Sequence, residues 1–168
     1  MKRVLACVAF LAVFISASVA SAQATPNRSG FGIGLGEANL AWGISMKGAQ
    51  GATAWQVVAG GWSGPWFYDY RYGYADGLAV AFDFLFEQPT ITEGEPLALG
   101  WNAGLGAGVG IAENSYWGIG LNGVVGLEFN FKPVPIDVTL EYRPGVYFHP
   151  NDFDLALVDF GGHVRFWF

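Results

Sequence analysis

The sequence predicts an all-β protein, an eight-stranded antiparallel transmembrane β-barrel that follows an N-terminal signal peptide. Eight segments alternate apolar with small or polar residues at a period of two, as strands with one apolar and one polar side do. Most run for roughly 9 to 15 residues, enough for the tilted crossing of a bilayer. The chain is 52% hydrophobic and holds 25 glycines, without a helical period beyond the first 24 residues.

The N-terminus has the three parts of a secretory signal. Lys2 and Arg3 precede an apolar run over residues 4–20, and small residues in A-x-A spacing follow it. We expect residues 1–24 to be removed and residues 25–168 to form the barrel. The alternative, a retained anchor, is disfavoured because the run falls short of the about 20 residues that a helical span needs. Cys7 would leave with the signal.

The net charge of the chain indicates which partners can be expected. Beyond residue 24 the chain has six basic and 14 acidic residues. A surplus of negative charge repels phosphate backbones, so nucleic acid is not expected as a partner.

The first four predicted strands alternate large apolar residues with small or polar ones. Residues 31–36 alternate Phe, Ile and Leu with glycine, and residues 40–47 alternate Leu, Trp, Ile and Met with Ala, Gly, Ser and Lys. Residues 52–62 are the least regular segment. Residues 78–87 alternate Leu, Val and Phe with smaller or acidic residues.

The last four predicted strands follow the same pattern. Residues 97–111 alternate apolar side chains with a run of glycines, and residues 117–131 and 136–148 alternate them with polar residues. Residues 155–168 put Ala, Val and Phe on one face and Asp, His and Arg on the other. An even number of strands lets a barrel close with both ends on one side.

Glycines at every second position of residues 104–110 lie inside a strand, so they are not a nucleotide-binding loop. An eight-stranded barrel has an interior just wide enough for side chains. We therefore expect Arg143, Tyr147, Arg165 and Trp167 to fill the lumen against this glycine wall.

Inward-facing polar residues in the last two strands predict a structural network, because buried polar groups must pair. Its members are Asp137, Glu141, Arg143, Asp159, His163 and Arg165. A catalytic pair of His163 with Asp159 or Glu141 is the less favoured interpretation.

The link over residues 63–76, SGPWFYDYRYGYAD, is long and aromatic, and it lies on the side opposite the termini. It could bind a surface protein or glycan, because loops carry binding and Trp and Tyr are frequent at hot spots. The candidate residues are Trp66, Phe67, Tyr68, Tyr70, Arg71, Tyr72 and Tyr74. The rival interpretation is an aromatic girdle at the membrane interface.

A second outward loop holds His149, Asn151, Asp152 and Asp154, which could bind a divalent cation or transfer protons. Because Pro, Asn and Asp are turn residues, a solvated turn is favoured. We expect no metal and no cofactor.

The segments FGIGLGE, VGLEFNFKPVPIDVTLEYRPGV and GGHVRFWF resemble a family of small outer-membrane barrels of spirochaetes and other Gram-negative bacteria, grouped with OmpA-like and OmpX-like barrels. The resemblance covers most of residues 30–168 and departs most at residues 63–76. The terminal Phe166 and Phe168 resemble an outer-membrane assembly signal.

The family implies an eight-stranded barrel in the cell outer membrane, with lipid and the barrel assembly machinery as partners. No enzymatic chemistry is established for it, and surface loops of some members are proposed to bind host proteins. The expected function is therefore non-enzymatic, structural or in surface interaction.

Two alternatives remain. A lipid-modifying outer-membrane enzyme would need a nucleophilic serine beside a histidine on the lipid-facing wall, whereas Ser45 faces inward and Ser63 and Ser115 lie in loops. A soluble lipocalin-like barrel would carry a hydrophobic ligand in an apolar interior. The glycine stripe and the terminal Phe168 disfavour it.

Overall fold

The computed structural model describes residues 29–63, 77–112, 117–150 and 152–168, and the predicted signal peptide lies outside this part. The described chain is all β-strand and turn. No helix within it is long and apolar enough to cross a membrane.

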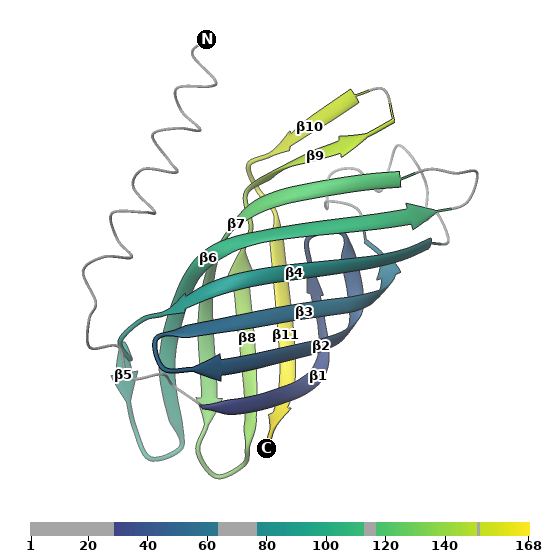
Figure 1. Ribbon diagram of the computed structural model, residues 1–168. Helices are drawn as coiled ribbons and strands as arrows, with labels where there is room; N and C mark the ends of the chain where they lie inside the picture. Colours follow the sequence, from purple (N-terminus) through teal and green to yellow (C-terminus); the bar gives the residue numbers. More distant parts are fainter. Residues whose placement is uncertain (1–28, 64–76, 113–116, 151) are drawn as a thin grey trace, which may run out of the picture.

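Eight strands form a closed antiparallel ring in the order β1-β2-β3-β4-β6-β7-β8-β11, with β11 paired to β1 (Figure 1). The prediction of an eight-stranded antiparallel barrel is therefore confirmed. The ring strands are β1 (Gly30–Ala38), β2 (Ala41–Gln50), β3 (Thr53–Trp62), β4 (Gly77–Glu87), β6 (Leu97–Ala112), β7 (Trp117–Phe131), β8 (Ile136–Tyr142) and β11 (Phe160–Trp167). We call the end where β1 begins and β11 ends the proximal end, and the other the distal end.

Two predicted strands are interrupted, which corrects the expectation for residues 136–148 and 155–168. The first splits into β8 and β9 (Gly145–His149), and the second into β10 (Asp152–Ala156) and β11. Pro144 stands at the first break, where it has no N–H for a neighbouring strand. Past this break β9 pairs with β7 and β10 pairs with β9, so the β9–β10 hairpin projects from the distal end (Figure 1).

The proximal link over residues 88–96 also contains structure. Its two-residue strand β5 (Thr92–Glu93) pairs with the start of β6. This pairing explains why the link is longer than an ordinary turn.

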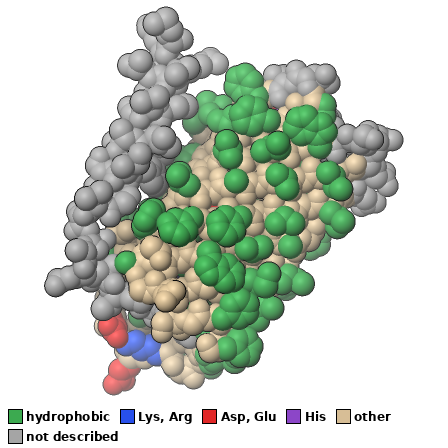
Figure 2. Space-filling view, in the orientation of Figure 1, with side chains coloured by type: hydrophobic (Ala, Val, Ile, Leu, Met, Phe, Trp, Pro, Cys, Tyr) green, Lys and Arg blue, Asp and Glu red, His purple; other side chains and the backbone are tan. Residues whose placement is uncertain are grey.

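The strands place large apolar side chains outside and polar side chains inside. Figure 2 shows hydrophobic side chains spread over the strands on the face in view, with the visible acidic and basic side chains at its lower end. Exposed apolar residues of the ring strands include Ile33, Leu35, Ile44, Val80, Phe82, Leu105, Val109, Ile119, Leu121, Leu127, Leu140 and Val164. Inside lie Lys47, Gln56, Arg143 and Arg165, all buried.

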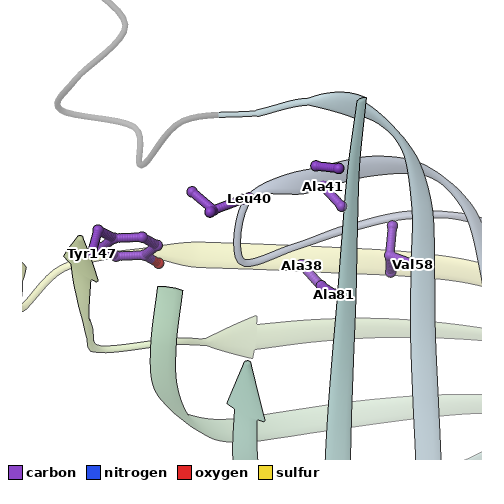
Figure 3. Close-up of a cluster of buried hydrophobic side chains, with 7 residues drawn as sticks. Ala38, Leu40, Ala41, Val58, Ala81 and Tyr147 are labelled. Atoms are coloured by element: carbon purple, nitrogen blue, oxygen red, sulfur yellow. The ribbon is translucent and has the colours of Figure 1, made fainter. Parts of the chain in front are cut away.

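The turn between β1 and β2 folds into the distal lumen. Asn39 has a φ of 54°, a left-handed conformation that asparagine tolerates better than most residues. Asn39 and Leu40 are buried, and the Asn39 amide donates a hydrogen bond to Asn122 on β7. Leu40, which its parity had placed on the outer face, instead joins the buried cluster in Figure 3 with Val58 and Tyr147.

This turn corrects the expectation about the glycine wall. A Cβ at Gly108 would lie 2.7 Å from Asn39 Oδ1, and a Cβ at Gly110 would overlap the Trp62 ring. Asn39 and Trp62 are therefore the side chains that fill the space over this part of the wall. The sequence pattern missed Asn39 because a turn does not follow the alternation of a strand. Trp62 is the last residue of β3, which was the least regular of the predicted segments.

The side chains that were expected against the wall are buried in the lumen but lie elsewhere. Arg143 is next to Gly161, 3.0 Å from a Cβ built there, and Trp167 lies over Gly32. Arg165 pairs with residues of β8, and Tyr147 packs in the buried cluster with Leu40 and Val58.

Adding a methyl group to the wall should destabilise the barrel where the backbone is closest. A Cβ at Gly104 would overlap the Phe84 carbonyl oxygen, whereas a Cβ at Gly123 would meet its nearest atom at 3.9 Å. We expect Gly104→Ala to lower the free energy of unfolding by about 1–3 kcal/mol and Gly123→Ala to change it by less than about 0.5 kcal/mol. Urea unfolding of the refolded barrel measures both, and equal midpoints would contradict the packing described.

Candidate functional site

The barrel interior brings together polar side chains from seven of the eight ring strands and from the segments beside β9 and β11. They are Ser45, Lys47, Gln56, Asp83, Glu87, Asn102, Asn122, Glu128, Asn130, Asp137, Thr139, Glu141, Arg143, Asp159, His163 and Arg165, all buried. Most of these groups pair in three layers, which we name after their cations.

The Arg143 layer lies toward the distal end. The guanidinium contacts Asp83 Oδ1 at 2.5 Å and Glu141 Oε2. Gln56 Nε2 donates a hydrogen bond of 2.8 Å to the second oxygen of Asp83. One cation thus holds two carboxylates from opposite sides of the barrel.

The same layer contains a serine, a histidine and a glutamate in series. Ser45 Oγ lies 3.0 Å from His163 Nδ1, and His163 Nε2 lies 3.1 Å from Glu141 Oε2. Nucleophilic catalysis uses this order of groups. The pair of His163 with Glu141 was considered from the sequence, whereas Ser45 could not be assigned to it because Ser45 and His163 are 118 residues apart. Ser45 has no exposed surface and His163 is 2% exposed, so a substrate has no access. The contacts fit a structural network better.

The Arg165 layer joins the last strand to β8. Arg165 Nε contacts Asp137 Oδ1 at 3.2 Å, and its terminal nitrogens donate to Thr139 and Gln56. Trp167 Nε1 donates to the other oxygen of Asp137 at 2.8 Å. Asp137 therefore receives two donors from β11.

The Lys47 layer joins β2 to β4, β6 and β7. Lys47 Nζ lies 2.7 Å from Glu87 Oε1 and also contacts Glu128 Oε1. Asn102 Nδ2 donates to Glu128 Oε1 at 2.8 Å. Here again one cation is held between two carboxylates.

The six residues of the predicted network are all inside the barrel, although they do not form one direct contact set. Glu141, Arg143 and His163 share a layer, whereas Asp137 and Arg165 form another. Asp159 lies at the distal margin, where it accepts a hydrogen bond of 2.5 Å from the Tyr147 hydroxyl.

Sequence reasoning did not assign Lys47, Gln56, Glu87, Asn102 and Glu128 to the network. Each of them occupies an inward position in the alternation of its strand, so this signal was present. A polar residue at an inward position of a narrow barrel can be assigned to the lumen without knowing its partner.

The other predicted sites have different outcomes. Residues 66–74 lie outside the described part, as does Asn151. His149 Nε2 contacts Asp154 Oδ2 at 2.7 Å, and no described group of three or more His, Cys, Asp or Glu side chains could hold a metal ion. Phe166 and Phe168 are exposed on the outer surface with ring centroids 5.2 Å apart.

A single ion pair lies on the proximal links of the described chain. Lys132 Nζ contacts Glu93 Oε1 at 2.6 Å, and both side chains are largely exposed. The hydrogen bond from Lys132, together with its charge, holds the pKa of Glu93 below its usual value. This exposed pair contrasts with the buried pairs of the lumen.

Comparisons with protein-family models, curated proteins and solved structures find no match to this chain.

Removing the cation of the Arg143 layer should destabilise the barrel strongly. Arg143→Met leaves Asp83 and Glu141 buried without their cation, which costs about 3–5 kcal/mol for comparable buried pairs. Lys132→Met, which breaks an exposed pair, should leave the unfolding midpoint unchanged within error. Urea unfolding followed by tryptophan fluorescence compares the two; similar losses would argue against a structural role for this layer.

Proposed function

We propose that this chain is a non-enzymatic outer-membrane β-barrel protein with a structural or surface-interaction role. The observation that carries the proposal is the inverted distribution of side chains. Leu35, Leu78 and Ile111 are each more than 60% exposed on the outer wall, whereas Lys47, Arg143 and Arg165 are at most 1% exposed inside. Water disfavours so large an apolar surface, and lipid accommodates it.

The aromatic residues of the outer surface support a membrane setting. Toward the proximal end the exposed rings are Phe31, Trp55, Phe84, Phe131, Phe166 and Phe168. Toward the distal end they are Trp42, Trp117, Phe148, Phe153 and Phe160. Between them lie mostly aliphatic residues, and two aromatic belts around an aliphatic band are typical of barrels that cross a bilayer.

The same distribution counts against a lipocalin-like carrier, which needs an apolar interior for its ligand. The described apolar interior consists of two small clusters, one around Leu40 and Tyr147 and the other around Leu85 and Trp167. Charged and amide side chains occupy the space between them. A hydrophobic ligand has no matching surface there.

The non-enzymatic part of the proposal is supported by the burial of the interior groups. Ser45, His163 and Glu141 are the best-arranged set for chemistry, and none is more than 2% exposed. A reaction would require a substrate to enter a lumen that their own neighbours occupy.

The surface-interaction part depends on the aromatic link that leaves β3 at Trp62 and returns to β4 at Gly77. Both strand ends lie at the distal end, opposite the end where β1 begins and β11 ends. This end would face the cell exterior if the proximal end faces the periplasm.

A lipid-facing position can be tested by a paired arginine substitution. Leu140 is 56% exposed on β8, and Ile91 is 54% exposed on the proximal link. In lipid vesicles, Leu140→Arg should lower the free energy of unfolding by about 2–4 kcal/mol, while Ile91→Arg should change it by at most about 1 kcal/mol. A soluble barrel in detergent-free buffer, or equal effects of the two substitutions, would contradict the membrane assignment.

Location itself is tested by fractionating cells that express the full chain. We expect the protein to stay with the outer membrane after alkaline extraction and to migrate differently on a gel before and after heating. Release into the soluble fraction would refute the proposal.

The role of the aromatic link is tested by replacing Tyr68, Tyr70 and Tyr72 together with serine. A binding role predicts a normally assembled barrel whose cells lose attachment to a surface protein or glycan. A girdle role predicts lower stability in lipid with attachment unchanged. A triple variant that assembles and attaches like the parent would exclude this segment.

A further inference from the structure

The three layers of the lumen do not carry equal charge. In the Arg165 layer, one cation faces one carboxylate, Asp137. In each of the other two layers, one cation contacts two carboxylates, so both have a surplus negative charge. Burying an uncompensated charge is costly, and a protein normally avoids it by pairing or by taking up a proton.

The Arg143 layer differs from the Lys47 layer by a histidine. His163 Nε2 is 3.1 Å from Glu141 Oε2, and an imidazole is a side chain that can bind a proton. The Lys47 layer has no such histidine among the described residues. Its compensation must come from one of its own carboxylates or from a bound ion.

Buried oxygen atoms of the Lys47 layer also lack hydrogen-bond donors. Both carboxylate oxygens of Glu87 and Asn102 Oδ1 have no hydrogen-bond partner among the described residues, although Glu87 is 2% exposed and Asn102 is fully buried. The two residues are paired in register on β4 and β6, so their side chains are neighbours on the inner face. Glu87 Oε2 and Asn102 Oδ1 are acceptors, and one hydrogen between them would satisfy both.

Rotating the Asn102 amide does not solve this problem. Its Nδ2 donates to Glu128 Oε1 at 2.8 Å, and exchanging the amide atoms would present an oxygen to that carboxylate. The missing donor is therefore associated with Glu87.

We propose that Glu87 binds a proton in the folded barrel and is a neutral carboxylic acid there. Oε1 stays in contact with the Lys47 ammonium, and the hydroxyl at Oε2 donates to Asn102 Oδ1. The proton comes from water during folding and leaves Lys47 and Glu128 as a neutral pair. A metal ion fits less well, because hard cations take about six or more oxygen ligands and Lys47 Nζ is already 2.7 Å from this carboxylate.

The charged groups that face Glu87 all belong to the layers described. Lys47 on β2 attracts its anionic form, and Glu128 on β7 repels it. Arg165 on β11 also acts on it, but that charge is paired with Asp137 on β8. The inner residues on β3 and β6, Ala54, Gln56 and Asn102, are neutral.

Infrared spectroscopy of the refolded full barrel at neutral pH tests the proposal, because a protonated carboxyl has a C=O band separate from that of a carboxylate. We expect this band in the parent protein and its loss in Glu87→Gln, which preserves the shape and supplies an amide donor to Asn102. Glu93→Gln, the same change at an exposed carboxylate, should retain it. Glu128→Gln should also lose the band, because Glu87 is then the only partner of Lys47.

The proposal would be overturned if the parent spectrum lacked the band, which is the result expected if an ordered water lies between Glu87 and Asn102. It would also be overturned if the band persisted in Glu87→Gln at full intensity. Stability supplies a second measurement. The unfolding midpoint of the parent should fall as the pH rises through the range where Glu87 loses its proton, and that of Glu87→Gln should not. If Glu87→Gln does not assemble, the parent and Glu128→Gln spectra decide.

Discussion

The whole barrel depends on one constraint, the strand register that sends the charged side chains of the three layers inward. Because side chains alternate along a strand, a shift of one residue in β11 would turn His163, Arg165 and Trp167 toward the outside. In the observed register, Asp137 instead accepts hydrogen bonds from both Arg165 and Trp167. Turning these groups outward would break the hydrogen bonds that they make inside, so the polar lumen determines the register as well as filling the barrel.

Glycine leaves room for large rings on both faces of the barrel wall. Gly32 pairs with Trp167 and Gly36 with His163 on the inner face, while Gly61 pairs with Trp42 on the outer face. In each pair the large ring lies where a Cβ of the opposite residue would be. Glycine weakens a strand by itself, and the cross-strand ring covers the backbone that it leaves bare.

Much of the barrel could be predicted from the sequence because its alternation is a local property. The bounds of β7 agree with the pattern over residues 117–131, and the inward polar faces of β8 and β11 follow from parity alone. Partners could not be predicted, since Ser45 meets His163 only through closure of the ring. Leu40 was misplaced because it belongs to a turn, and Pro144 was included in a continuous strand because the apolar period resumes after it.

The inward turn between β1 and β2 has a consequence for how the protein can change in evolution. Distal connections of a barrel ordinarily accept insertions, because they extend into solvent and carry little packing. This one is different, since Ala38, Asn39 and Leu40 are part of the packed interior and Asn39 is hydrogen-bonded to the opposite wall. The length of this turn is therefore limited by the volume of the lumen. In relatives of this barrel, insertions and deletions would be confined to the other distal connections.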